Sequence, residues 1–386
     1  MTARQQTKRA GKKQHEPLLH IVKRPAVPFW HAWLIRVAAV VAALIFGGLV
    51  TLLLTGENPL AVYATMIEGS FGTPRRIWTL LQGTAVLLCI SLAVTPAFKM
   101  RFWNTGAEGQ VLIAGMASAA CMLKLAGLMP AWAVLLLSVA AAIVAGAVWA
   151  LIPALFKARF GTNETLFTLM MNYIAIQLVS YFSILWAVPK GSGQIGVINA
   201  TSKIGWLPQI GNKYLLSILV AAALTVAMFI YLKYSKHGYE ISVVGESENT
   251  ARYIGINVKK VVIRTMLLSG AVCGLAGALL VLGIDHTVST HTVGGQGFTA
   301  IMVSWLGKFN PVYMILTSFL IIFLQKGAGE ISSKFSLNDS FSEIITGIII
   351  FFIIGCEFFI NYRIVFRAKQ KPARVSAQGR EKEEQA

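Results

Sequence analysis

The stretch LIRVAAVVAALIFGGLVTLLLT, from Leu34 to Thr55, decides the class of fold, because it is an apolar run long enough for a helix to cross a bilayer. One crossing needs about 20 apolar residues, and Arg36 is the only charge that interrupts this run. Other apolar blocks lie at residues 77–98, 107–127, 131–156, 166–188, 214–234, 263–283, 311–324 and 341–361, with a shorter one at 298–307. The sequence therefore predicts an all-α integral membrane protein.

The composition agrees with a membrane protein and argues against two other classes. Of the 386 residues, 56% are hydrophobic and only 13% are charged, too few charges to cover a water-soluble domain of this length. The net charge of +18 could indicate nucleic-acid binding, but the basic residues lie at the ends of apolar blocks and in the tails, where the positive-inside rule places them. The first block is too long for a secretory signal peptide. We therefore expect membrane lipid, and no nucleic acid, as a partner.

The lysines and arginines set the orientation of the chain in the membrane. If the N-terminus is cytoplasmic, six crossings return the chain to the cytoplasm at residues 235–262, a loop with several basic residues. The C-terminal tail is also basic, so an even number of crossings must follow, and the short block at 298–307 supplies the missing one. The sequence thus predicts about ten transmembrane helices. It predicts a basic cytoplasmic tail at 1–33, a transmembrane domain at 34–362 and a second cytoplasmic tail at 363–386.

Ten crossings divide into two five-helix halves, and an odd number per half gives the halves opposite orientations, as in transporters with inverted repeats. The third crossing begins with NTGAEGQ at 104–110 and the eighth with VGGQGF at 293–298, at corresponding places in the two halves. Paired glycine-interrupted segments point to a substrate path. We predict that this path is lined by Asn104, Gly106, Glu108, Gly109, Gln110, Asn172, Gln296 and Phe298.

Some of these residues also have a purely structural interpretation, which the sequence leaves open. Asn104 or Thr105 could cap the third helix, and the positive end of the helix dipole would then favour Glu108. Asn172 lies inside the fifth apolar block, where an amide more often bonds a neighbouring helix than a solute. A structural role and a place on the path are compatible for Glu108.

The polar segment GYEISVVGESENTARYIGINVKK, residues 238–260, predicts a short helix within the middle cytoplasmic loop. Ser247 is suited to cap a helix at residues 248–254, with acidic residues in its first turn. Ala251 and Ile254 fall on one face, so this helix is suited to docking a soluble protein. The alternative is a helix that lies on lipid headgroups, but its apolar area is small for that role.

The chain lacks the motifs of several other classes. It has no Gly-x-x-x-x-Gly-Lys-Ser/Thr phosphate loop, no His-Glu-x-x-His zinc motif and no Gly-x-Ser-x-Gly nucleophile elbow, so we expect no catalytic residues and no cofactor. An ion-coupled secondary transporter is a rival interpretation, but it needs buried carboxylates, and few acids lie at mid-membrane depth. No standard metal spacing is formed by Asp285, His286 and His291, or by Cys89, Cys121, Cys273 and Cys356.

Three segments resemble motifs of a known family. The segment at 103–110 is WNTGAEGQ, similar to Phe-Asn-Ile-Gly-Ala-Glu-Gly-Gln; the segment at 245–257 is GESENTARYIGIN, similar to Gly-Glu-Asn-Pro-x-Ala-Ala-Arg-Tyr-Ala-Gly-Ile; and the segment at 297–307 is GFTAIMVSWLG, similar to Gly-Phe-x-Gly-Ile-Ala-Val-Ala-Leu-Leu-Gly. In this order and spacing they resemble permease subunits of bacterial ABC importers for branched-chain amino acids, ribose and nucleosides. Within that group they are most similar to the nucleoside-type permeases that work with basic-membrane-protein lipoproteins. The positions that depart from the pattern are Trp103, Thr105, Ser304 and Trp305.

The resemblance implies a multi-pass permease of the bacterial cytoplasmic (inner) membrane. It implies three partners: an ABC ATPase subunit at the middle loop, an extracytoplasmic solute-binding lipoprotein, and a second permease subunit that forms a heterodimer. The implied solute is a nucleoside, with a simple sugar or a flavin-like compound as the alternative. The residues implied to couple to the ATPase are Glu246, Glu248, Asn249, Ala251, Arg252, Tyr253, Ile254, Gly255 and Ile256.

Overall fold

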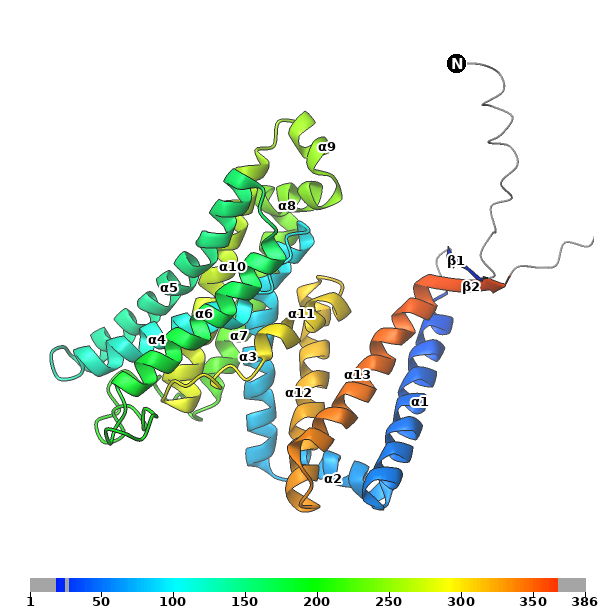
Figure 1. Ribbon diagram of the computed structural model, residues 1–386, viewed down its shortest axis with the longest axis horizontal. Helices are drawn as coiled ribbons and strands as arrows, with labels where there is room; N and C mark the ends of the chain where they lie inside the picture. Colours follow the sequence, from blue (N-terminus) through cyan, green and yellow to red (C-terminus); the bar gives the residue numbers. More distant parts are fainter. Residues whose placement is uncertain (1–18, 25–27, 367–386) are drawn as a thin grey trace, which may run out of the picture. The chain divides into compact units, whose positions relative to one another are not determined.

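The computed structural model describes residues 19–24 and 28–366, and these residues form two units (Figure 1). One unit comprises the described residues up to Gly56 together with those from Gly347 onward, and the other spans Glu57–Thr346. The predictions for the outer parts of the two tails, residues 1–18 and 367–386, lie outside the described residues.

The first unit contains the helix α1 (Phe29–Thr55), the later part of α13 (Asp339–Asn361) and two short strands. The strands β1 (Leu19–Lys23) and β2 (Tyr362–Phe366) pair antiparallel. The sequence predicts neither strand, and their pairing is a local departure from the all-α class. Both segments, LHIVK and YRIVF, contain adjacent β-branched residues, which favour strands. The helix α1 also begins at Phe29, before the predicted boundary at residue 34.

The charge in the first apolar block has a partner within this unit. The guanidinium of Arg36 donates from Nη2 to Oε1 of Glu357 on α13 at 2.8 Å. A charged side chain in a transmembrane segment is costly unless it is paired. This ion pair explains how a block that is otherwise apolar tolerates an arginine.

In the second unit, the helix α3 (Pro74–Lys99) lies at the centre of a helical bundle. Nearly every side chain from Thr84 to Phe98 is buried, on all faces of the helix. Its neighbours in the bundle include α4 (Ala107–Leu125) and α10 (Val258–Leu280), and α5 (Ala131–Phe160) packs against both of these. A helix that is apolar on every side is expected to be surrounded by other helices, as α3 is.

Glycines bring α5 and α10 into close contact. A Cβ atom on Gly274 would lie 2.7 Å from the Cα of Ile143, and one on Gly270 would lie 2.9 Å from the Cα of Ala147. A Cβ on Gly146 would in turn lie 3.0 Å from the Cα of Gly274. Small residues at such crossings let two helix backbones approach. The glycines of α10 therefore allow it to pack closely on α5.

The other elements complete the second unit. The helices α8 and α9 lie together at one end of the bundle (Figure 1). The bounds of the remaining elements are α2 (Pro59–Phe71), α6 (Glu164–Leu185), α7 (Leu215–Tyr234), α8 (Lys236–Glu246), α9 (Glu248–Tyr253), the π-helical turn η2 (Val281–Asp285), α11 (Gln296–Leu306) and α12 (Pro311–Lys334).

Eight helices in the described part of the chain are long and apolar enough to span a membrane: α1, α3, α5, α6, α7, α10 continued by η2, α12 and α13. The predicted third and eighth crossings correspond to α4 and α11, and neither is among these eight. The reason is physical: α4 carries Glu108, Gln110 and Lys124, and α11 has only 11 residues. Each of these two helices follows a glycine-rich segment.

Candidate functional site

The two glycine-rich segments meet at the carboxylate of Glu108. Its Oε1 accepts a hydrogen bond from the backbone N–H of Gly295 at 2.9 Å, and its Oε2 accepts one from that of Gly297 at 2.7 Å. These N–H groups lie at the N-terminus of α11, where the helix dipole favours a negative charge. Segments that are 187 and 189 residues apart in the chain are therefore joined by one buried side chain.

Two glycines at this junction are packed closely against their neighbours on the side where a Cβ atom would lie. A Cβ atom on Gly297 would lie 2.7 Å from the Cα of Glu108, and one on Gly109 would lie 2.8 Å from Oδ1 of Asn172. Real Cβ atoms do not approach other atoms this closely. The glycines are thus required by close backbone approach.

The amide of Asn172 joins α6 to the start of α4. Its Oδ1 accepts from the N–H of Gly109 at 2.8 Å, and its Nδ2 donates to the carbonyl oxygen of Thr105 at 2.8 Å. The hydroxyl of Thr105 also bonds α6. It donates to the carbonyl oxygen of Thr165 at 3.1 Å and lies 3.0 Å from the hydroxyl of Thr168. The helix-bonding interpretation of Asn172 is confirmed, and its place on a substrate path stays a prediction.

Asn104 joins the same segment to α10. Its Oδ1 accepts from the N–H of Gly106 at 3.1 Å and from Nε2 of Gln110 at 3.2 Å, while its Nδ2 donates to Oγ of Ser269 at 3.2 Å. Asn104 does not cap α4 from the predicted position, because the residue before α4 is Gly106 and no side chain caps it. The Asn104 side chain instead fixes the turn that leads into α4.

Two hydrogen-bond acceptors near the Glu108 junction have no donor. Oε1 of Gln110 and Oε1 of Gln296 are buried and have no hydrogen-bond partner among the described residues. A buried polar atom without a partner is costly, so it is a candidate for bonding a solute or water. Phe298, one turn into α11, is 44% exposed. Of the predicted path residues, these three therefore retain surface or bonding capacity for a solute.

The predicted helix in the middle loop is present as α9. Oγ of Ser247 accepts from the N–H of Thr250 at 3.2 Å, and Gly255 adopts φ +86° just after the helix, as a C-terminal stop. The prediction that Ala251 shares an exposed face with Ile254 is wrong. Ala251 is fully buried within the chain, whereas Tyr253 is 92% exposed.

The surroundings of α9 explain this difference. The loop also contains α8, a helix that the sequence pattern does not predict. Its buried residues are Gly238, Ile241, Val244 and Gly245. It is held to α10 by an ion pair of Glu240 with Arg264 at 2.8 Å. With one side of α9 packed inward in this way, its exposed surface is polar or aromatic. The exposed residues of the predicted coupling set are Glu246, Glu248, Asn249, Arg252, Tyr253, Ile254 and Gly255, and Ile256 is half-buried.

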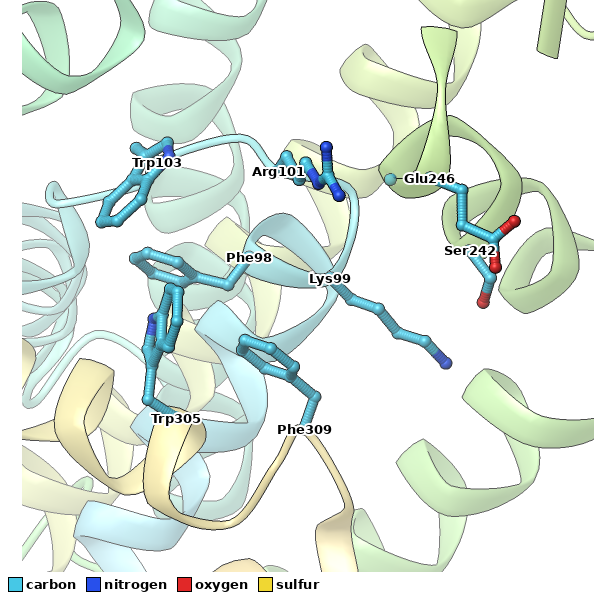
Figure 2. Close-up of a pocket in the computed structure, with 9 residues that line it drawn as sticks. Phe98, Lys99, Arg101, Trp103, Ser242, Glu246, Trp305 and Phe309 are labelled. Carbon is cyan, nitrogen blue, oxygen red and sulfur yellow. The ribbon is translucent and has the colours of Figure 1, made fainter. Parts of the chain in front are cut away.

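A pocket of about 430 Å³ lies between the end of α3 and α8 (Figure 2). Figure 2 shows four aromatic side chains gathered on one side, Ser242 and Glu246 on the opposite side, and Lys99 and Arg101 between them. The aromatic residues are Phe98, Trp103, Trp305 and Phe309. Trp103 and Trp305 depart from the family motif, but their contact could not be predicted from the sequence, because they are distant in the chain.

His286, one of the residues considered above for a metal site, packs against an aromatic ring instead. The ring of His286 stacks on Trp206, with centroids 3.6 Å apart and planes at 2°, and Trp206 donates from Nε1 to the carbonyl oxygen of Ile198 at 2.9 Å. Burial lowers the pKa of His286, and the nearby charge of Lys213 lowers this pKa further. No group of three potential metal ligands occurs within the residues that were placed.

These features define a class of protein: a multi-pass α-helical membrane protein in which two helices outside the eight long apolar ones, α4 and α11, meet at a buried carboxylate. Residues 76–354 match the family described as the permease component of the branched-chain amino acid transport system, and the chain belongs to this family. Because family members are transport components, the chain is a permease of the cytoplasmic membrane rather than a catalytic enzyme. The family also implies an ATPase and a solute-binding protein as partners in general.

Several curated relatives are similar over most of their length. The chain is 30% identical to the glucose ABC transporter permease protein TsgB13 of Haloferax volcanii, over 90% of this chain and 93% of that protein. It is 30% identical to the guanosine ABC transporter permease protein NupP of Bacillus subtilis, over 83% of this chain and 92% of that protein. It is 27% identical to the nucleoside ABC transporter permease protein NupB of Lactococcus lactis, over 91% of this chain and 98% of that protein. The predicted resemblance to ABC transporter permeases of the nucleoside type is confirmed.

Proposed function

We propose that the chain is the permease subunit of an ABC importer that moves a nucleoside-like solute into the cytoplasm. The observation that carries this proposal is the junction at Glu108, where two short helices from the two halves of the chain begin beside each other. Helices that begin at depth in a transporter commonly present their polar ends to the solute. The nucleoside is supported by the guanosine and nucleoside permeases among the relatives.

A sugar is the second candidate solute, because the glucose permease of Haloferax volcanii is as similar to this chain as the guanosine permease is. Uptake by the complete transporter in proteoliposomes separates the two. We expect ATP-dependent accumulation of labelled guanosine, with glucose transported at least tenfold more slowly. Faster transport of glucose than of guanosine would identify the solute as a sugar. Uptake that does not depend on ATP would reject the assignment as an ABC importer.

The path through the permease is proposed to pass along the starts of α4 and α11. Gln110 and Gln296 would offer their unpaired oxygens to hydroxyl or amino groups of the solute. Asn104 and Asn172 would hold the path in shape rather than contact the solute, since each amide bonds the backbone of the turn before α4. Glu108, Gly106, Gly109 and Phe298 would complete the lining.

For energy and solute delivery, three partners are proposed. An ABC ATPase would bind the exposed residues of α8 and α9, a lipoprotein would deliver the solute outside, and a second, different permease would complete the pore. This chain has no phosphate loop of its own, so ATP energy must enter through another subunit. The exposed side chains of Tyr253 and Ile254 support α9 as the contact.

Ten crossings in two inverted halves are proposed: the eight apolar helices together with α4 and α11. This arrangement places α9 in the cytoplasm and the segment between α6 and α7 outside. Single cysteines at Ser202 and Asn257, both exposed, test it in a chain whose four native cysteines have been replaced. We expect an impermeant thiol reagent to label the two positions from opposite sides. Labelling of both from one side would reject an odd number of crossings between them.

A further inference from the structure

We propose that the aromatic pocket at the end of α3 binds the base of a nucleoside solute on its way into the cytoplasm, an inference that rests on the proposed function. The pocket is the space of about 430 Å³ shown in Figure 2. This volume lies within the range of roughly 300–1,000 Å³ that is typical of small-molecule sites. Its neighbour α8 is cytoplasmic in the proposed topology, so the pocket lies near the cytoplasmic end of the path.

One side of the pocket offers faces for stacking. The rings of Trp103 and Trp305 lie with centroids 5.7 Å apart and planes tilted by 35°. Phe98 supports both indoles edge-on, at 5.7 and 6.4 Å, and Phe309 contacts Trp305 at 5.5 Å. The two indoles are 46% and 50% exposed, so part of each surface is open. Because every nucleobase has a π-face, any of the bases can stack on such a wall.

The opposite side offers hydrogen bonds for a sugar. Glu246 presents a carboxylate that accepts from hydroxyl groups, and Arg101 and Lys99 present donors. Neither Arg101 nor Glu246 has a hydrogen-bonded or ionic side-chain partner among the residues that the structure describes. These groups therefore remain available to a ligand. The hydroxyl of Ser242 donates to the carbonyl oxygen of Gly238 at 2.9 Å and keeps lone pairs that can accept.

A ligand that satisfies both sides needs a planar ring at one end and several hydroxyl groups at the other. A nucleoside has this form. A simple sugar has no planar aromatic ring and would place less of its surface on the two indoles, and an acyl chain of a lipid would leave the polar side without partners. The pocket thus favours a nucleoside over a sugar by its shape and by the separation of its apolar and polar walls.

The two tryptophans are also two of the positions at which this chain departs from the motif of the resembling family. Trp103 stands where the motif of the resembling family has Phe, and Trp305 stands where it has Leu. Larger indole faces at both positions increase the area available for stacking. These substitutions would adapt the exit of this transporter to a large aromatic base.

The experiment is equilibrium binding of labelled guanosine to the complete transporter in lipid nanodiscs, without ATP or the binding protein. We expect Trp103→Leu and Trp305→Leu each to weaken binding about tenfold, as expected for loss of a base-stacking ring. Trp103→Phe should keep most of the affinity. The control Trp132→Leu changes an exposed tryptophan of α5, outside the pocket, and should bind as the wild type does.

The outcomes distinguish failure of the pocket proposal from failure of the importer proposal. If the double variant Trp103→Leu, Trp305→Leu binds guanosine as tightly as the wild type, or if ribose competes as well as guanosine does, the pocket is not a base-binding site. That result leaves the importer intact so long as the wild type accumulates guanosine with ATP. Size-exclusion chromatography of each variant identifies any that fails to assemble. In that case tryptophan fluorescence decides: weaker quenching by guanosine in Trp103→Phe and Trp305→Phe than in the wild type supports stacking on these indoles, and equal quenching rejects it.

Discussion

Glu108→Ala is expected to reduce ATP-dependent solute uptake by at least tenfold, although the chain still inserts into the membrane. The carboxylate is the acceptor for the N–H groups of Gly295 and Gly297, and alanine leaves both without one. An unsatisfied buried donor costs about 1–3 kcal/mol. Since a tenfold change corresponds to about 1.4 kcal/mol, loss of either bond is enough to displace the start of α11 in part of the population. Uptake in proteoliposomes and thermal unfolding of the purified transporter measure the effect.

Two variants give this prediction its control. Glu108→Gln keeps one acceptor oxygen and should retain intermediate uptake. Glu164→Ala removes another carboxylate from the first turn of a helix, α6, but its partner is Lys157 at 2.7 Å rather than the backbone of a second segment. We expect a much smaller loss from this variant. Wild-type uptake by Glu108→Ala would show that the junction of α4 and α11 has no part in transport.

Tyr253→Ala is expected to weaken binding of the ATPase by at least tenfold and to reduce uptake in parallel. Tyr253 is the most exposed large side chain of α9, and removal of a tyrosine at the centre of an interface commonly costs about 2 kcal/mol or more. Capture of solute by the external binding protein should be unchanged. Titration of the ATPase against the purified permease, together with uptake, provides the measurement.

The matched control is Tyr181→Ala, because Tyr181 is also exposed but lies on α6. Its loss should leave ATPase binding unchanged. Ala251→Glu would be a poor substitute for Tyr253→Ala, since Ala251 is fully buried and a charge there would disrupt the packing of α9 itself. Full ATPase affinity and full uptake in Tyr253→Ala would exclude the exposed face of α9 as the coupling contact.

The long helices could be predicted from the sequence, because the length of an apolar run is a local property. The cap at Ser247 and the stop at Gly255 are local in the same sense, and both are confirmed.

The structural features that could not be predicted from the sequence depend on contacts between residues that are distant in the chain. The bond from Glu108 to Gly297 spans 189 residues, and nothing local in either segment identifies its partner. The burial of Ala251 could not be predicted, because it depends on the packing of α9 beside α8, a helix with no clear local signal in the sequence. The strands β1 and β2 were missed because each is short and becomes a strand only through the other.

The late position of α11 in the chain has a consequence for how the protein is made. During synthesis α4 emerges with Glu108 well before Gly295 and Gly297 exist, and α11 has only 11 residues to hold it in lipid. Neither helix is therefore expected to be retained in the bilayer on its own hydrophobicity. Both must therefore pack against helices that are already inserted around them. A chain whose synthesis stops before α11 has no backbone donors for Glu108, and we expect membrane proteases to degrade it.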